Sequence, residues 1–163
     1  MATLYPVPIK DIDYKTEVNS LGFTLYEEAA LLNAWRYVKQ NIQYHSHEIF
    51  LNFFTKNEHF IGQFRDQNGK LNLVVLYKHS KSVLFTFTYL IENGIHDVRR
   101  MNLMLSYWSR AHYENGVRRN DIILLCDAVL SHIVEALGCK CTTTIKGALD
   151  KIILILLDAY PEI

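Results

Sequence analysis

The stretch "LSYWSRAHYENGV", residues 105–117, decides how this chain is organised, because it carries an apolar helical pattern into a turn. His112 follows Trp108 by four residues and Leu105 by seven, so the three side chains share one face of a helix. Gly116 then marks the turn that ends this helix. The stretch therefore predicts an inward-facing imidazole at the C-terminal end of a helix.

Helical patterns continue on both sides of this stretch. Thr24 followed by Glu27 has the spacing of a capping box and predicts a helix start. The apolar stripe of that helix consists of Leu25, Leu31, Leu32, Trp35 and Val38. Further helices are expected over residues 46–64, where a second helix runs into a short third one, and over 71–94, 98–112, 119–138 and 142–160, with Asn120 as a candidate cap. The sequence predicts an all-α chain of six long helices, with at most one short turn besides.

Length and composition favour one domain with a sizeable core, since half of the 163 residues are hydrophobic. The first residues lack apolar periodicity, so we expect residues 1–23 to form an N-terminal extension on the surface of a domain spanning 24–163. The 17 basic and 17 acidic residues balance. This balance excludes a general nucleic-acid binder, which needs a basic surplus, and a polybasic membrane anchor.

The cysteines and the apolar runs indicate a reduced, cytoplasmic protein. Cys126, Cys139 and Cys141 are odd in number and show no disulfide framework. The first residues carry acids and prolines where a signal peptide has an apolar segment. The late apolar run at residues 152–157 is far shorter than the roughly 20 residues of a membrane span.

Two of the seven histidines stand apart by their neighbours. His79 shares a helix face with Leu76 and Val83, and His112 lies at its helix end. Each of the two, taken alone, has the pattern of an ordinary core histidine. Together they suit haem, whose porphyrin already supplies four nitrogens, better than zinc, which usually takes three or four protein ligands.

The other five histidines are predicted to have no site role. His45 and His47 are expected to be surface residues near a helix start, although their His-x-His spacing also occurs in metal sites. His59, His96 and His132 have charged or polar neighbours. The segment around Cys139 and Cys141 is expected to be a connecting loop.

Over residues 25–160 the chain resembles the globin family. "LLNAWRYV" is similar to the first globin helix, with Trp35 at the usual tryptophan, and "IFLNFFTKNEHFIGQF" ends at Phe64, where globins carry a phenylalanine against the haem. "HSKSVL" resembles the distal helix. "LSYWSRAHYENGV" resembles the Leu-x-x-Leu-x-x-x-His-x-x-x-Gly-Val pattern around the proximal histidine, with Trp108 in place of its second leucine.

The chain also departs from the globin pattern. Glu58 stands where a proline usually begins the third helix, and Phe50, which cannot donate a hydrogen bond, holds a distal-pocket position. Ser46 and Ser80 fall where the family has small residues at a helix crossing.

The resemblance implies a globin fold around haem b, with His112 as the proximal iron ligand and His79 as the distal histidine. The implied haem-pocket residues, besides these two, are Phe60, Phe64, Leu76, Val83, Phe87, Trp108, Val117 and Ile122. Under this resemblance His79 either hydrogen-bonds an oxygen ligand or binds the iron itself in a six-coordinate resting state. Both alternatives stay open at the level of sequence.

The implied function is reversible binding of oxygen, with CO and NO as related ligands, for storage, transport or buffering rather than catalysis. One alternative is a haem redox enzyme, such as a nitric oxide dioxygenase, nitrite reductase or peroxidase-like protein, working with a reductase partner. The other is a gas sensor or an interaction protein on the same fold. Turnover with a reductant would identify the first alternative, and a ligand-dependent partner the second.

Overall fold

The computed structural model describes residues 15–162, and within that range the chain is all-α without a β-strand. The α-helices are α1 (Leu25–Gln40), α2 (Ile42–Lys56), α3 (Leu73–Tyr89), α4 (Val98–Glu114), α5 (Arg119–Leu137) and α6 (Thr143–Asp158). Three short segments join them: the 3₁₀ turns η1 (Glu58–Phe64) and η3 (Gly138–Lys140), and the π-helical η2 (Leu90–Gly94). The prediction of six long helices is confirmed for this part of the chain.

Side-chain caps explain where most of these helices begin. Thr24 and Glu27 form the predicted capping box at α1, with each side chain accepting a hydrogen bond from the other's backbone N–H. Asp97 caps α4 by accepting from two backbone N–H groups. The predicted cap at Asn120 is wrong: Asn120 lies inside α5, and the Asp121 carboxylate instead accepts from the Arg118 backbone N–H at 2.9 Å.

Two helix boundaries differ from the sequence-based prediction, because the local pattern of apolar residues does not determine where the backbone changes direction. α2 begins at Ile42, about one turn before the expected start, so His45 and His47 lie within the helix. The long helix expected over residues 71–94 changes to π-helical geometry at Leu90. Gly94 ends this segment where Met101 of α4 approaches, since a Cβ at Gly94 would lie 3.0 Å from the Met101 side chain.

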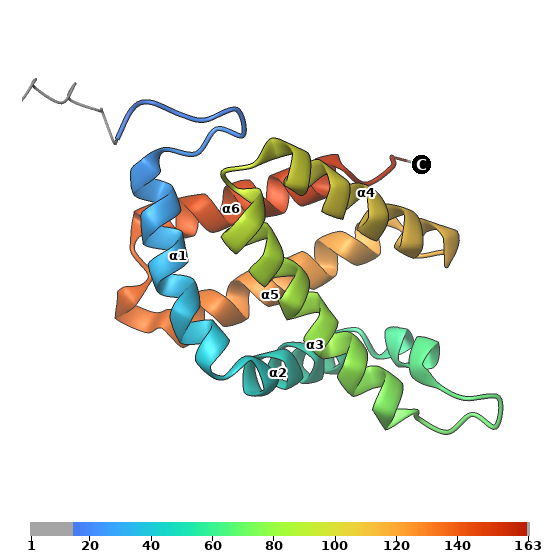
Figure 1. Ribbon diagram of the computed structural model, residues 1–163. Helices are drawn as coiled ribbons and strands as arrows, with labels where there is room; N and C mark the ends of the chain where they lie inside the picture. The colour runs from blue at the N-terminus through green and yellow to red at the C-terminus, as the bar shows by residue number, and fades with distance from the viewer. Residues whose placement is uncertain (1–14, 163) are drawn as a thin grey trace, which may run out of the picture.

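The helices cross one another rather than forming a parallel bundle (Figure 1). In this view α3 passes in front of α5; it packs against α2, while α1 packs against α6. Ser46 on α2 and Ser80 on α3 are both buried, as expected where two helices approach closely. α2 and α6 also pack against α5, so α5 lies at the centre of the arrangement.

The core under α1 contains one polar link. The Trp35 indole N–H donates to the Thr88 hydroxyl at 2.9 Å, and both side chains are buried. Trp35 also packs against Phe87, with 6.3 Å between ring centres. α1 is thereby fixed to α3, the helix that carries His79.

The described part of the N-terminal extension, residues 15–23, is attached to the helical body. The Asn19 side chain donates to the Ile95 carbonyl and to Glu28, and it accepts from the backbone of Leu21 and Phe23. Phe23 is 1 % exposed and belongs to the core. The expectation of a surface arm is therefore wrong at Phe23, and its first 14 residues lie outside the described range.

Among the described helices, the segment Arg119–Lys140, which contains α5, is long and apolar enough to cross a membrane by length and composition. One row of its side chains, Ile122, Cys126, Val129, Ile133 and Leu137, is buried inside the protein. α5 therefore packs as one side of the core in this structure.

Candidate functional site

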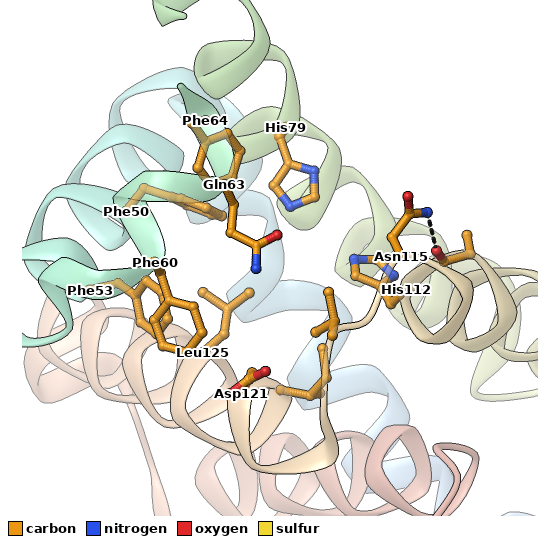
Figure 2. A pocket seen from close by; sticks show the side chains of 13 residues that line it. Phe50, Phe53, Phe60, Gln63, Phe64, His79, His112, Asn115, Asp121 and Leu125 are labelled. Atoms are coloured by element: carbon orange, nitrogen blue, oxygen red, sulfur yellow. Dashed lines mark hydrogen bonds between the residues drawn. The ribbon is translucent and has the colours of Figure 1, made fainter. Parts of the chain in front are cut away.

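A cavity of about 400 Å³ opens between α2, η1, α3, α4 and α5, and its volume is within the range of small-molecule sites (Figure 2). Its lining is mainly apolar and aromatic. The residues are Phe50, Phe53, Phe60, Gln63, Phe64, His79, Ala111, His112, Asn115, Val117, Asp121, Ile122 and Leu125. The cavity brings the two histidines singled out in the sequence to one place.

His112 is held in one orientation by the backbone of its own helix. Its ring nitrogen Nδ1 lies 2.8 Å from the Trp108 carbonyl oxygen, one turn earlier on α4. Because a carbonyl can only accept, Nδ1 carries the proton and donates. In the neutral ring this leaves the lone pair on Nε2 free, which is how proteins orient an imidazole for metal binding.

His79 faces the cavity from α3 among aromatic rings. The Phe50 and Phe64 rings lie 5.8 and 5.5 Å from it, centre to centre. Burial, followed by the nearby His112, lowers the His79 pKa below its usual value of 6.5. At neutral pH its imidazole is therefore uncharged and can offer a lone pair.

The spacing of the two rings matches two ligands of one metal ion. The ring centres of His79 and His112 are 6.0 Å apart with the rings tilted by 53°, and Figure 2 shows both side chains at one end of the cavity. Metal–imidazole bonds are about 2.0–2.1 Å long, so two imidazoles on opposite sides of one ion have ring centres about 6.3 Å apart. The observed spacing is thus close to that of a bis-imidazole centre.

Trp108 supports the His112 side of the cavity from behind. Its ring lies 5.1 Å from that of His112 and 5.5 Å from that of Tyr160, centre to centre. Tyr160 is buried, and its hydroxyl donates to the Val117 carbonyl at 2.6 Å. Tyr160, two residues after α6, is in this way tied to the turn that follows His112.

The structure brings most of the sequence-predicted pocket residues to this region. Phe60, Phe64, His79, His112, Val117 and Ile122 line the cavity itself. Val83, Phe87 and Trp108 line a smaller space of about 30 Å³ that shares His112 and Ile122 with it. Leu76 instead lines a separate hollow, with Tyr77 and Ser80 from the same helix.

Sequence reasoning missed several lining residues. Phe53, Leu125 and Ala111 lie on apolar helix faces, where nothing in the pattern separates a cavity wall from a packed core. Gln63, Asn115 and Asp121 give the cavity its polar groups, and Figure 2 shows the Gln63 side chain reaching into it. The one signal for Phe50 was its place in the globin pattern.

The donor set fits haem better than a metal ion held by the protein alone. In the described part of the chain, no group of three histidine, cysteine or carboxylate side chains could hold a metal ion. Two imidazoles in an apolar cavity supply the two axial ligands that iron in a porphyrin takes. The polar groups of the cavity lining are the amides of Gln63 and Asn115 and the carboxylate of Asp121.

Of the remaining histidines, His45, His47 and His132 are half-buried, whereas His59 and His96 are exposed. His45 on α2 contacts His132 on α5, and both rings are half-buried. His47 is half-buried and lies against the Tyr77 ring, and its Nε2 is buried without a hydrogen-bond partner among the described residues. The prediction that His45 and His47 are surface residues is therefore wrong, because α2 starts earlier and turns both toward its neighbours.

The chain matches no protein-family model, and no curated protein is significantly similar to it in sequence.

Proposed function

We propose that this chain is a haem-binding protein of the globin type that reversibly binds oxygen and related diatomic gases. The observation that carries the proposal is the pair His79 and His112, with ring centres 6.0 Å apart at the end of an aromatic cavity. Bound haem supplies an iron centre that takes up diatomic gases and exchanges electrons. The helix order and the placement of the two histidines support the globin-like reading.

Each residue has a distinct role under this proposal. His112 is the permanent ligand, because its Nδ1–H bond to the Trp108 carbonyl holds Nε2 in one direction. His79 is the exchangeable ligand, since no side chain or backbone group in the described range hydrogen-bonds its ring. The phenylalanines on the α2 and η1 side exclude water from the space between them.

A redox or gas-sensing role is the second candidate, and the same spacing favours it. A ring separation close to that of a bis-imidazole centre makes His79 compete with external gases for its position. With haem bound, such competition would slow gas uptake, because His79 would have to leave first. A sensor or an electron-transfer protein uses that competition, whereas a simple carrier does not need it.

The visible absorption spectrum of the haem-reconstituted protein tests the proposal. Sharp, resolved bands in the ferrous state under nitrogen, replaced reversibly on adding oxygen or CO, are expected for exchangeable binding by His79. One broad ferrous band would mean that His79 does not bind and that an open gas-binding site prevails. Failure to take up haem in a one-to-one ratio would refute the proposal.

A further inference from the structure

A second pair of histidines joins α2 to α5 away from the cavity. Nδ1 of His45 lies 3.0 Å from Nε2 of His132, and the ring centres are 5.2 Å apart. One nitrogen donates and the other accepts, so in the hydrogen-bonded state the two rings share one proton between them. Both side chains are half-buried in the contact between the helices.

The nitrogen spacing suits two neighbouring ligands of one metal ion. With metal–nitrogen bonds of about 2.0–2.1 Å, two adjacent imidazole nitrogens lie about 2.9 Å apart in square-planar geometry and about 3.3 Å apart in tetrahedral geometry. The observed 3.0 Å lies between these values. This spacing fits chelation, which also requires each ring to rotate until its lone pair points at the ion rather than at the other ring's nitrogen.

Carboxylates accompany both histidines at the same spacing. Glu48 follows His45 by three residues on α2, and Glu135 follows His132 by three on α5, so each carboxylate shares its histidine's helix face. Both carboxylates act electrostatically on His132. Neither forms an ion pair within residues 15–162, so either can turn toward the histidines.

We infer that His45 and His132 bind a divalent transition metal ion, Zn²⁺ or Cu²⁺, with Glu48 or Glu135 and water completing the coordination. No third ligand side chain of residues 15–162 groups with the pair, so a carboxylate has to turn toward the histidines for the ion to bind. The ion joins α2 to α5. The haem proposal plays no part in this inference.

Binding needs a change of tautomer and no net loss of protons. His45 must carry its proton on Nε2 and His132 on Nδ1, so that the two facing nitrogens both present lone pairs. The shared proton moves to the far nitrogen of the same ring. Burial lowers the pKa of both rings below 6.5, and the charge of His132 lowers that of His45 further. Both rings are therefore neutral near pH 7.

Thermal unfolding with Zn²⁺ tests the inference on the full chain. We expect Zn²⁺ to raise the Tm of the wild type by a few degrees through preferential binding to the folded state, and EDTA to reverse the rise. The rise should be lost in both His45→Gln and His132→Gln, whose metal-free Tm values report whether they fold. It should persist in His59→Gln, an exposed control, and in His112→Gln, which removes the cavity pair.

Cu²⁺ electron paramagnetic resonance supplies a second readout. The wild type should show hyperfine coupling to two nitrogens, and each single variant should lose it. Several results would overturn the inference: no Zn²⁺ effect on the wild type, an effect that survives in both glutamine variants, or one that disappears in His112→Gln alone. The last result would place the ion between His79 and His112 while leaving the haem test unaffected.

Discussion

Two pairs of histidines bridge helices in this protein, and they differ in what lies between the rings. His79 and His112 have ring centres 6.0 Å apart and open onto an aromatic cavity. His45 and His132 have ring centres 5.2 Å apart and a direct nitrogen–nitrogen hydrogen bond of 3.0 Å. The His79–His112 spacing suits an ion placed between two opposed rings. The His45–His132 spacing suits an ion bound by two neighbouring ligands on the same side.

The difference shows how the surroundings decide what a pair of imidazoles can bind. The cavity pair lies among aromatic rings, with Asp121 as the carboxylate of the cavity lining, and under the haem proposal the porphyrin would supply the remaining ligands. The pair between α2 and α5 has a carboxylate three residues after each histidine, which is the basis of the proposed Zn²⁺ or Cu²⁺ site. Both pairs consist of histidines, so the difference between them lies in the side chains that surround each pair.

The largest expected effect comes from His112→Ala. Removing the oriented ligand should lower haem affinity by about two orders of magnitude or more, because even loss of an outer-shell partner costs 10–100-fold at metal sites. Haem titration followed at the main absorption band measures this. His59→Ala, on the exposed surface, should bind haem like the wild type, and equal affinity of the two variants would break the assignment.

His79→Leu should keep haem and change its spectrum. The variant retains His112 and its bond to the Trp108 carbonyl, so we expect one-to-one haem binding. The sharp ferrous bands should become one broad band, and CO binding should become faster because no internal ligand has to leave first. An unchanged spectrum and CO rate would remove His79 from the site.

Trp108→Leu tests the support behind His112, and its effect should fall on stability rather than on haem. The hydrogen bond to His112 comes from the main-chain carbonyl and survives the substitution. Loss of ring contacts with His112 and Tyr160 should lower the free energy of unfolding by about 1–3 kcal/mol, measured by urea denaturation. Tyr107→Leu, at a side chain 76 % exposed, is the matched control and should cost little.

The smallest effect is a pH dependence carried by the α2–α5 pair. Burial lowers the pKa of His45 and of His132. The carboxylates of Glu48 and Glu135 partly offset the lowering at His132. Tyr44 is a further titratable ring beside His45. As pH falls below about 6.5, the unfolded chain therefore binds more protons than the folded one, and stability falls. Stability attributable to this pair is present above that pH.

Urea unfolding of metal-free protein at about pH 7.5 and about pH 5.5 measures this loss. His132→Gln should show a smaller difference between the two conditions than the wild type, because one of the shifted groups is gone. His96→Gln, at an exposed position, should leave the difference unchanged. A pH dependence that His132→Gln does not reduce would assign the loss to other groups, such as His79.

The sequence by itself determined the helical class, most helix positions and the two cavity histidines. Helical spacing of apolar residues and local caps such as Thr24 with Glu27 act within one or two turns, so a linear pattern records them. His112 could be singled out because the helix face and the turn after it are both local. The role of His112 as a haem ligand rests on the globin resemblance and stays a prediction.

Tertiary structure alone decided which side chains meet. The pairing of His45 with His132 joins positions 87 residues apart, and neither residue was expected from the sequence to have a site role. The tertiary structure likewise places Leu76 outside the cavity and Gln63 and Asp121 in its lining. The physical reason is that the crossing of α2, α3 and α5 sets these contacts, and crossing geometry depends on how whole helix faces fit together rather than on spacing within one helix.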